Sequence, residues 1–88
     1  MTLDVFAEIV EEANRAECKY AGYTSTHEAY GVLAEQVAEL LEAIRSNKLE
    51  SVRCEAIQGS AVAARLASQC RDDGDFAARS VRLRGPKA

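Results

Sequence analysis

Residues 50–71, with the sequence ESVRCEAIQGSAVAARLASQCR, decide the fold. Alternating steps of three and four residues separate five positions of this stretch, namely Val52, Glu55, Gly59, Val62 and Leu66. On an α-helix this spacing places the side chains on one stripe that faces a core. Glu55 is the only acid on the stripe, so we expect its carboxylate to point inward.

An inward carboxylate at Glu55 requires a partner, because burying an ionised carboxylate alone costs several kcal/mol. One interpretation is a salt bridge to an Arg or Lys on a neighbouring helix. The other is a metal-binding or functional site, since groups of this kind gather at such sites. The periodicity by itself leaves both interpretations open.

The same stretch is rich in small side chains, which allow the backbones of neighbouring helices to approach closely. We therefore predict that this helix is central, packing against other helices or a second subunit on more than one side. The small residues are Ala56, Gly59, Ser60, Ala61, Ala63, Ala64, Ala67 and Ser68.

Two further helices are predicted before residue 50. The first spans about residues 2–20 and carries an apolar stripe that Glu17 shares; its members are Leu3, Phe6, Val10, Ala13 and Tyr20. The second spans about residues 26–46 and begins with a capping box formed by Ser25 and Glu28. Its predicted core-facing seam is Tyr30, Leu33, Val37, Leu40 and Ile44. A short turn at residues 47–48 makes the last two helices antiparallel.

The composition agrees with an all-α fold, because the chain has 88 residues, no Trp and a single Pro, Pro86. We predict two long antiparallel helices plus an N-terminal helix. The small size leaves a modest stability margin, so we expect homo-oligomerisation to complete the bundle as a dimer or tetramer. The predicted domain covers residues 1–75, followed by a basic tail at 76–88.

Cysteine usage and charge indicate the compartment and partners. Three cysteines without metal-type spacing favour free thiols in the cytoplasm. We expect no signal peptide and no membrane span. The net charge is −3, yet the tail has four bases and no acid. We interpret the tail as a solubilising terminus and consider nucleic-acid binding the weaker alternative.

Carboxylates offer the chemistry that the residues best support, since the chain has one His and no nucleophile or phosphate-loop motif. Four acids, Glu28, Glu35, Glu39 and Glu42, share one stripe of the second helix, with a solvated face as the default interpretation. Oxygen ligands on two adjacent helices can bind Mg²⁺ together with substrate phosphates. The candidate ligands are Glu35, Gln36, Glu39, Glu55 and Gln58.

Three segments resemble MazG-like proteins of phages and mobile elements. They are HEAYGVLAEQVAELLE at 27–42, EAIQ at 55–58 and AVAA at 61–64, and the resemblance covers about residues 25–67. It implies membership of the all-α NTP pyrophosphatases, whose helices carry E-E-x-x-E and E-x-x-D. In that family the acids bind Mg²⁺, which activates water and neutralises the triphosphate.

The family motif is altered at two positions. Glu35 and Glu39 match the outer acids of the first motif, and Gln36 replaces the middle one; Glu55 matches the second motif, and Gln58 replaces its Asp. Each Gln removes a negative charge, so Mg²⁺ affinity is expected to fall. The resemblance implies hydrolysis of a nucleoside triphosphate to the monophosphate and pyrophosphate, or nucleotide binding with a weakened metal site. The alternative is a catalytically inactive, homo-oligomeric interaction module.

Overall fold

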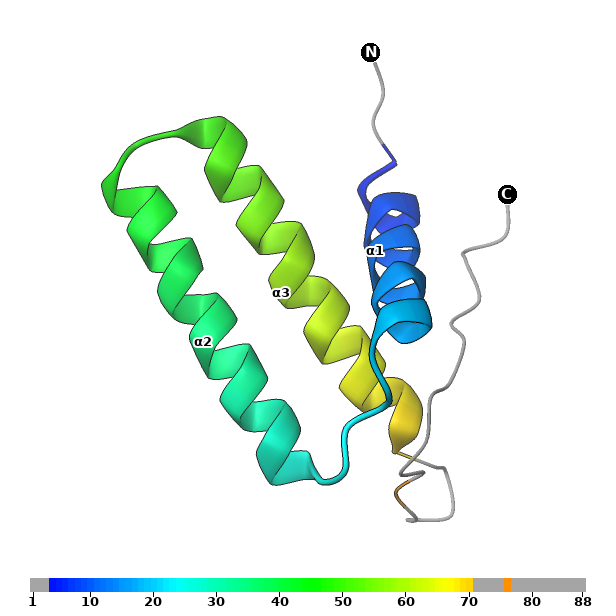
Figure 1. Cartoon of the computed structure of the whole chain (residues 1–88). Helices are drawn as coiled ribbons and strands as arrows, with labels where there is room; N and C mark the ends of the chain where they lie inside the picture. The colour runs from blue at the N-terminus through cyan, green and yellow to red at the C-terminus, as the bar shows by residue number, and fades with distance from the viewer. Residues whose placement is uncertain (1–3, 71–75, 77–88) are drawn as a thin grey trace.

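The computed structural model describes residues 4–70 and residue 76, and these form an all-α structure, as predicted. The helices are α1 (Val5–Lys19), α2 (Thr26–Arg45) and α3 (Leu49–Gln69) (Figure 1). The predicted basic tail lies outside the described residues except for Phe76, and so does the predicted start of the first helix. Among the described helices, none has both the length and the apolar content needed to cross a bilayer.

Side-chain caps explain where α1 and α2 begin. The Asp4 carboxylate accepts a hydrogen bond of 3.1 Å from the Ala7 N–H, and the Ser25 hydroxyl accepts one of 3.0 Å from the Glu28 N–H. Such bonds satisfy amides that have no partner in the first helical turn. The Glu28 carboxylate accepts from Thr24 N–H at 2.9 Å, one residue earlier than a capping box requires.

A short turn reverses the chain between α2 and α3. Asn47 has a φ of 60°, a left-handed conformation that Asn tolerates better than most residues. The two long helices consequently run antiparallel, as predicted (Figure 1).

The small-residue helix α3 is central, as predicted. It packs against both α1 and α2, whereas no Cα atom of α1 lies within 8 Å of one in α2 (Figure 1). Gly59 lies against α2, because a Cβ there would be in ordinary van der Waals contact with Gln36 Cγ, at 3.4 Å. The helices therefore form a curved layer with α3 in the middle.

The seam predicted on α2 is wrong by one residue at three of its five positions. Tyr30, Val37 and Ile44 are 71%, 54% and 52% exposed, respectively. The more enclosed stripe is Ala29, Leu33, Gln36, Leu40 and Ala43. Both stripes have heptad spacing, and small or flexible residues take the inner one because α3 approaches closely.

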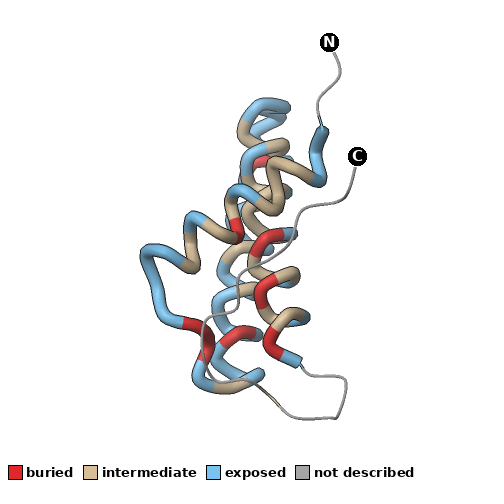
Figure 2. The backbone as a smooth tube through the Cα atoms, turned by 90° about the vertical axis from the view of Figure 1, so that its right-hand side faces the viewer, coloured by how far each residue is buried: buried red, intermediate tan, exposed pale blue. Residues whose placement is uncertain are grey.

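The buried apolar residues are few and mostly small. In the described residues they are Ala13, Tyr23, Ala29, Ala43 and Ala61. Figure 2 shows these buried positions as short, separate patches along the backbone. On α1, Phe6 and Tyr20 were predicted to face the core, yet they are mainly exposed. Much apolar surface thus remains uncovered in the single chain.

Hydrogen bonds and an ion pair join the end of α1 and the α1–α2 connection to the end of α3. The buried Gln69 side chain accepts from the Tyr23 N–H and donates to the Tyr23 carbonyl, both at 2.9 Å. Arg65 Nε donates to Glu17 at 2.6 Å, and these side chains are only 6% and 9% exposed. The inward position predicted for Glu17 is therefore confirmed, with Arg65 as its charged partner.

Candidate functional site

Glu55 lies half-buried on the side of α3 that faces α2, and its observed side-chain partner there is an amide. Gln36 Nε2 donates to Glu55 Oε1 at 2.6 Å and lies 3.5 Å from the Glu55 carbonyl oxygen. Within residues 4–70, no Lys or Arg nitrogen lies within 4.0 Å of this carboxylate. Of the two interpretations of Glu55, the salt bridge is thus not observed in the described chain.

Glu39 and Glu55 line the same shallow hollow near the α2–α3 turn. Its volume is about 280 Å³. Glu42, Lys48 and Ser51 also line it. The hollow therefore brings together one acid from each of the two predicted motifs, next to a cation that partly balances their charge.

Glu42 was not among the predicted ligands, although the sequence contains a signal for it. It shares the acidic stripe of α2 with Glu39, three residues away, so both carboxylates project to the same side of the helix. The family motif ends at Glu39, and for that reason the motif alone did not point to Glu42.

The other predicted ligands are distributed unevenly around Glu55. Gln36 contacts it directly, whereas Glu35 is exposed and is not part of the hollow. Gln58 donates to Cys54 Sγ at 3.5 Å and lines a different cavity. Within the described residues, no group of three or more Asp, Glu, His or Cys side chains is arranged to hold a metal ion. A cation in the hollow would depend on two carboxylates, water and ligand oxygens.

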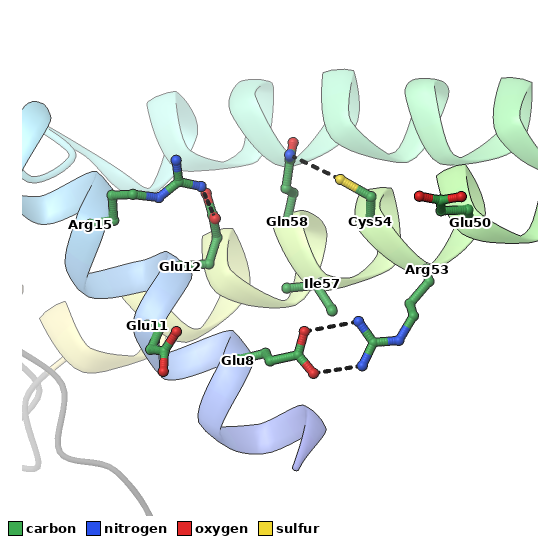
Figure 3. Close-up of a pocket in the computed structure, with 9 residues that line it drawn as sticks. All are labelled: Glu8, Glu11, Glu12, Arg15, Glu50, Arg53, Cys54, Ile57 and Gln58. Atoms are coloured by element: carbon green, nitrogen blue, oxygen red, sulfur yellow. Dashed lines mark hydrogen bonds and ion pairs between the residues drawn. The ribbon is translucent and has the colours of Figure 1, made fainter. Parts of the chain in front are cut away.

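A larger cavity, of about 570 Å³, lies between α1 and α3 (Figure 3). Arg53 donates two hydrogen bonds to the Glu8 carboxylate, at 2.9 and 2.6 Å, and Arg15 pairs with Glu12. The bonds from Arg53 hold the pKa of Glu8 below its ordinary value. Four of the charged side chains that line the cavity are therefore paired with one another. No sequence motif predicted this cavity.

A groove of about 420 Å³ lies between α1 and α2, and residues of α3 form its floor. Tyr20 and Val32 line its sides, and Gln36, Gln58 and Arg65 contribute polar groups. Arg65 also lies over the Tyr23 ring, 4.8 Å from its centroid. Gln36 thus lies between Glu55 on one side and this groove on the other, and connects the two.

Comparisons of the chain with protein-family models, with curated proteins and with solved structures found no match.

Proposed function

We propose that this chain is a MazG-like nucleotide-binding protein in which Glu39 and Glu55 hold one Mg²⁺ ion that carries a nucleoside triphosphate. The observation that supports this proposal best is the shared hollow, because it joins the acids of both motifs. Gln36 supports it further by fixing the orientation of the Glu55 carboxylate without neutralising its charge. A carboxylate that keeps its charge is the ligand that Mg²⁺ prefers.

The chemistry expected of this arrangement is metal-assisted hydrolysis between the α- and β-phosphates. Mg²⁺ would neutralise triphosphate oxygens and lower the pKa of a bound water. Two carboxylates form a weaker metal site than the five acids of the family pattern, so we expect weak Mg²⁺ binding that strengthens when the nucleotide supplies further oxygen ligands.

Calorimetry with MgCl₂ and a panel of NTPs and dNTPs tests the proposal, together with an assay for released pyrophosphate. We expect binding that requires metal and nucleotide together. Glu39→Gln and Glu55→Gln should each weaken it about tenfold or more, because each removes an anionic ligand. Glu11→Gln is the matched control, since Glu11 is an exposed acid beside the α1–α3 cavity. An absence of both binding and pyrophosphate would overturn the proposal.

The second candidate function is a catalytically inactive homo-oligomeric module. Its support is the large amount of exposed apolar surface, which includes Phe6, Tyr30 and Leu49 at 71%, 71% and 79% exposure. Monomeric proteins rarely leave large contiguous apolar surface uncovered. This candidate predicts a stable dimer or tetramer by light scattering, with an unfolding temperature that Mg²⁺ and nucleotides leave unchanged.

A further inference from the structure

The outer side of α2 carries a continuous apolar stripe. Its members are Tyr30, Ala34, Val37, Leu41 and Ile44, separated by alternating steps of four and three residues. All five are exposed in the single chain. At 100° per residue they span roughly 80° of the helix surface. This set is called the outer stripe below, and it contains no charged residue.

The neighbouring surface of α3 is also uncharged. Its exposed positions Ala56, Ser60, Ala63 and Ala67 follow steps of four, three and four residues. Counted at 100° per residue, this set and the outer stripe each point roughly 160–180° away from the residues that line the α1–α2 groove. Both sets therefore lie on one face of the α2–α3 hairpin, opposite the groove.

We propose that a second copy of this chain covers this face, with the two α2 helices antiparallel across a two-fold axis at Val37. The inference rests on the homo-oligomeric candidate above and deepens it by naming the surface and its symmetry. A two-fold interface requires one patch that is complementary to itself.

The outer stripe has this self-complementarity because its positions are arranged nearly symmetrically about Val37. An antiparallel pair places Tyr30 opposite the partner's Ile44, and it places Ala34 within one residue of the position opposite the partner's Leu41. A small side chain then meets a large one at Ala34 and Leu41, as interdigitating helices require, while Tyr30 and Ile44 make a contact between two large apolar side chains. A parallel pair would instead place Ala34 opposite the partner's Ala34 and bring the two Arg45 side chains together.

The size of the face is sufficient for a weak to ordinary dimer. Two helices about 10 Å wide and about 30 Å long present roughly 600 Å² per copy. The total is roughly 1,200 Å², which is the lower end of specific protein interfaces. The lack of charge on both sets of residues also removes the desolvation cost that charged side chains would add.

Disulfide trapping tests the proposal in the full chain, after Cys18, Cys54 and Cys70 have been replaced by Ser. Val37→Cys should form a covalent dimer under mild oxidation, because the axis brings residue 37 next to its own copy. Tyr30→Cys alone should not form one, whereas Tyr30→Cys combined with Ile44→Cys should. Glu35→Cys, on the opposite flank of α2, is the matched negative control.

Light scattering on the unmodified protein separates failure of this interface from failure of oligomerisation itself. An oligomer in which Val37→Cys does not cross-link would overturn the assigned face and leave the homo-oligomeric candidate standing. Cross-linking of Tyr30→Cys alone would overturn the antiparallel arrangement. A monomeric protein would overturn both and leave residues 77–88 or another protein to cover the face. None of these outcomes decides the proposed nucleotide binding, which is measured in a separate experiment.

Discussion

Replacing Gln36 with Glu puts a carboxylate where the amide now lies 2.6 Å from Glu55 Oε1. The change removes a hydrogen bond to a charged acceptor, which contributes about 1.5–3 kcal/mol. It also adds repulsion between two half-buried carboxylates, about 1–4 kcal/mol at 4 Å for effective dielectric constants between 80 and 20. Since the side chains can rotate apart, we expect the free energy of unfolding to fall by about 2–4 kcal/mol near neutral pH without divalent cations.

Magnesium should reverse most of this loss, because Gln36→Glu also restores the middle acid of the resembled motif next to Glu55. A cation bound only by the folded state raises stability with its concentration. Urea denaturation followed by circular dichroism, with and without MgCl₂, measures both effects. Two carboxylates at one site raise the pKa of one of them above its unfolded value. The loss should therefore shrink as the pH falls below that raised pKa and grow as the pH rises through it.

Gln36→Met is the matched control, because it removes the hydrogen bond without adding charge. We expect it to cost about 1–3 kcal/mol and to show no response to MgCl₂. If Gln36→Glu were as stable as the unmodified protein without metal, the contact with Glu55 would be refuted. If it were destabilised but unaffected by MgCl₂, the placement of a metal site at Glu55 would be refuted.

Three further predictions concern stability. Arg65→Met should lower the free energy of unfolding by about 3–5 kcal/mol in urea denaturation, because it leaves the buried Glu17 carboxylate without its charged partner; a loss below about 1 kcal/mol would contradict the buried pair. Glu8→Gln should lower the unfolding temperature near neutral pH but not well below the ordinary Glu pKa of 4.5, since the pKa of Glu8 is lowered in the fold: its contribution to stability is fully present above the ordinary value and is lost as the pH falls through the lowered pKa. Equal effects at both pH values in thermal melts would refute this. Ser25→Ala should cost about 1 kcal/mol and Ser25→Gly only a few tenths, because the hydroxyl caps α2; equal losses in denaturation would contradict the cap.

Local sequence signals were sufficient to predict the helices and their order. The hydroxyl cap at Ser25 and the turn at Asn47 depend on residues close together in the sequence, and both were found where expected. The central place of α3 followed from its small residues, whose effect on packing does not depend on the identity of the neighbour.

The register of α2 could not be predicted, because two heptad stripes lie one residue apart and only the shape of α3 decides between them. Apolar character favoured the stripe with Tyr30 and Val37, yet the residue that lies against Gly59 of α3 is Gln36. The same one-residue shift of the enclosed stripe places Gln36 in contact with Glu55. Periodicity had placed Glu55 inward, but it could not identify a partner 19 residues away on another helix.

The long-range ion pair of Arg65 and Glu17 was unpredictable for a related reason. The two residues are 48 positions apart, and their contact depends on the angle at which α1 crosses α3. Periodicity predicted that Glu17 points inward, but it did not identify Arg65 as its partner. The cavity around Glu8 and Arg53 likewise combines two helices that no sequence motif links.

The proposed Mg²⁺–nucleotide site is tested most directly by replacing Mg²⁺ with paramagnetic Mn²⁺ in isotope-labelled protein and following the backbone amide signals by NMR. If Glu39 and Glu55 hold the ion, Mn²⁺ with a nucleoside triphosphate should broaden the amides of these two residues and of Glu42 first, while those of Glu8 and Glu11 on α1 stay sharp. Glu55→Gln should remove the selective broadening. Broadening centred on α1, or no selective broadening at all, would contradict a metal site in the α2–α3 hollow.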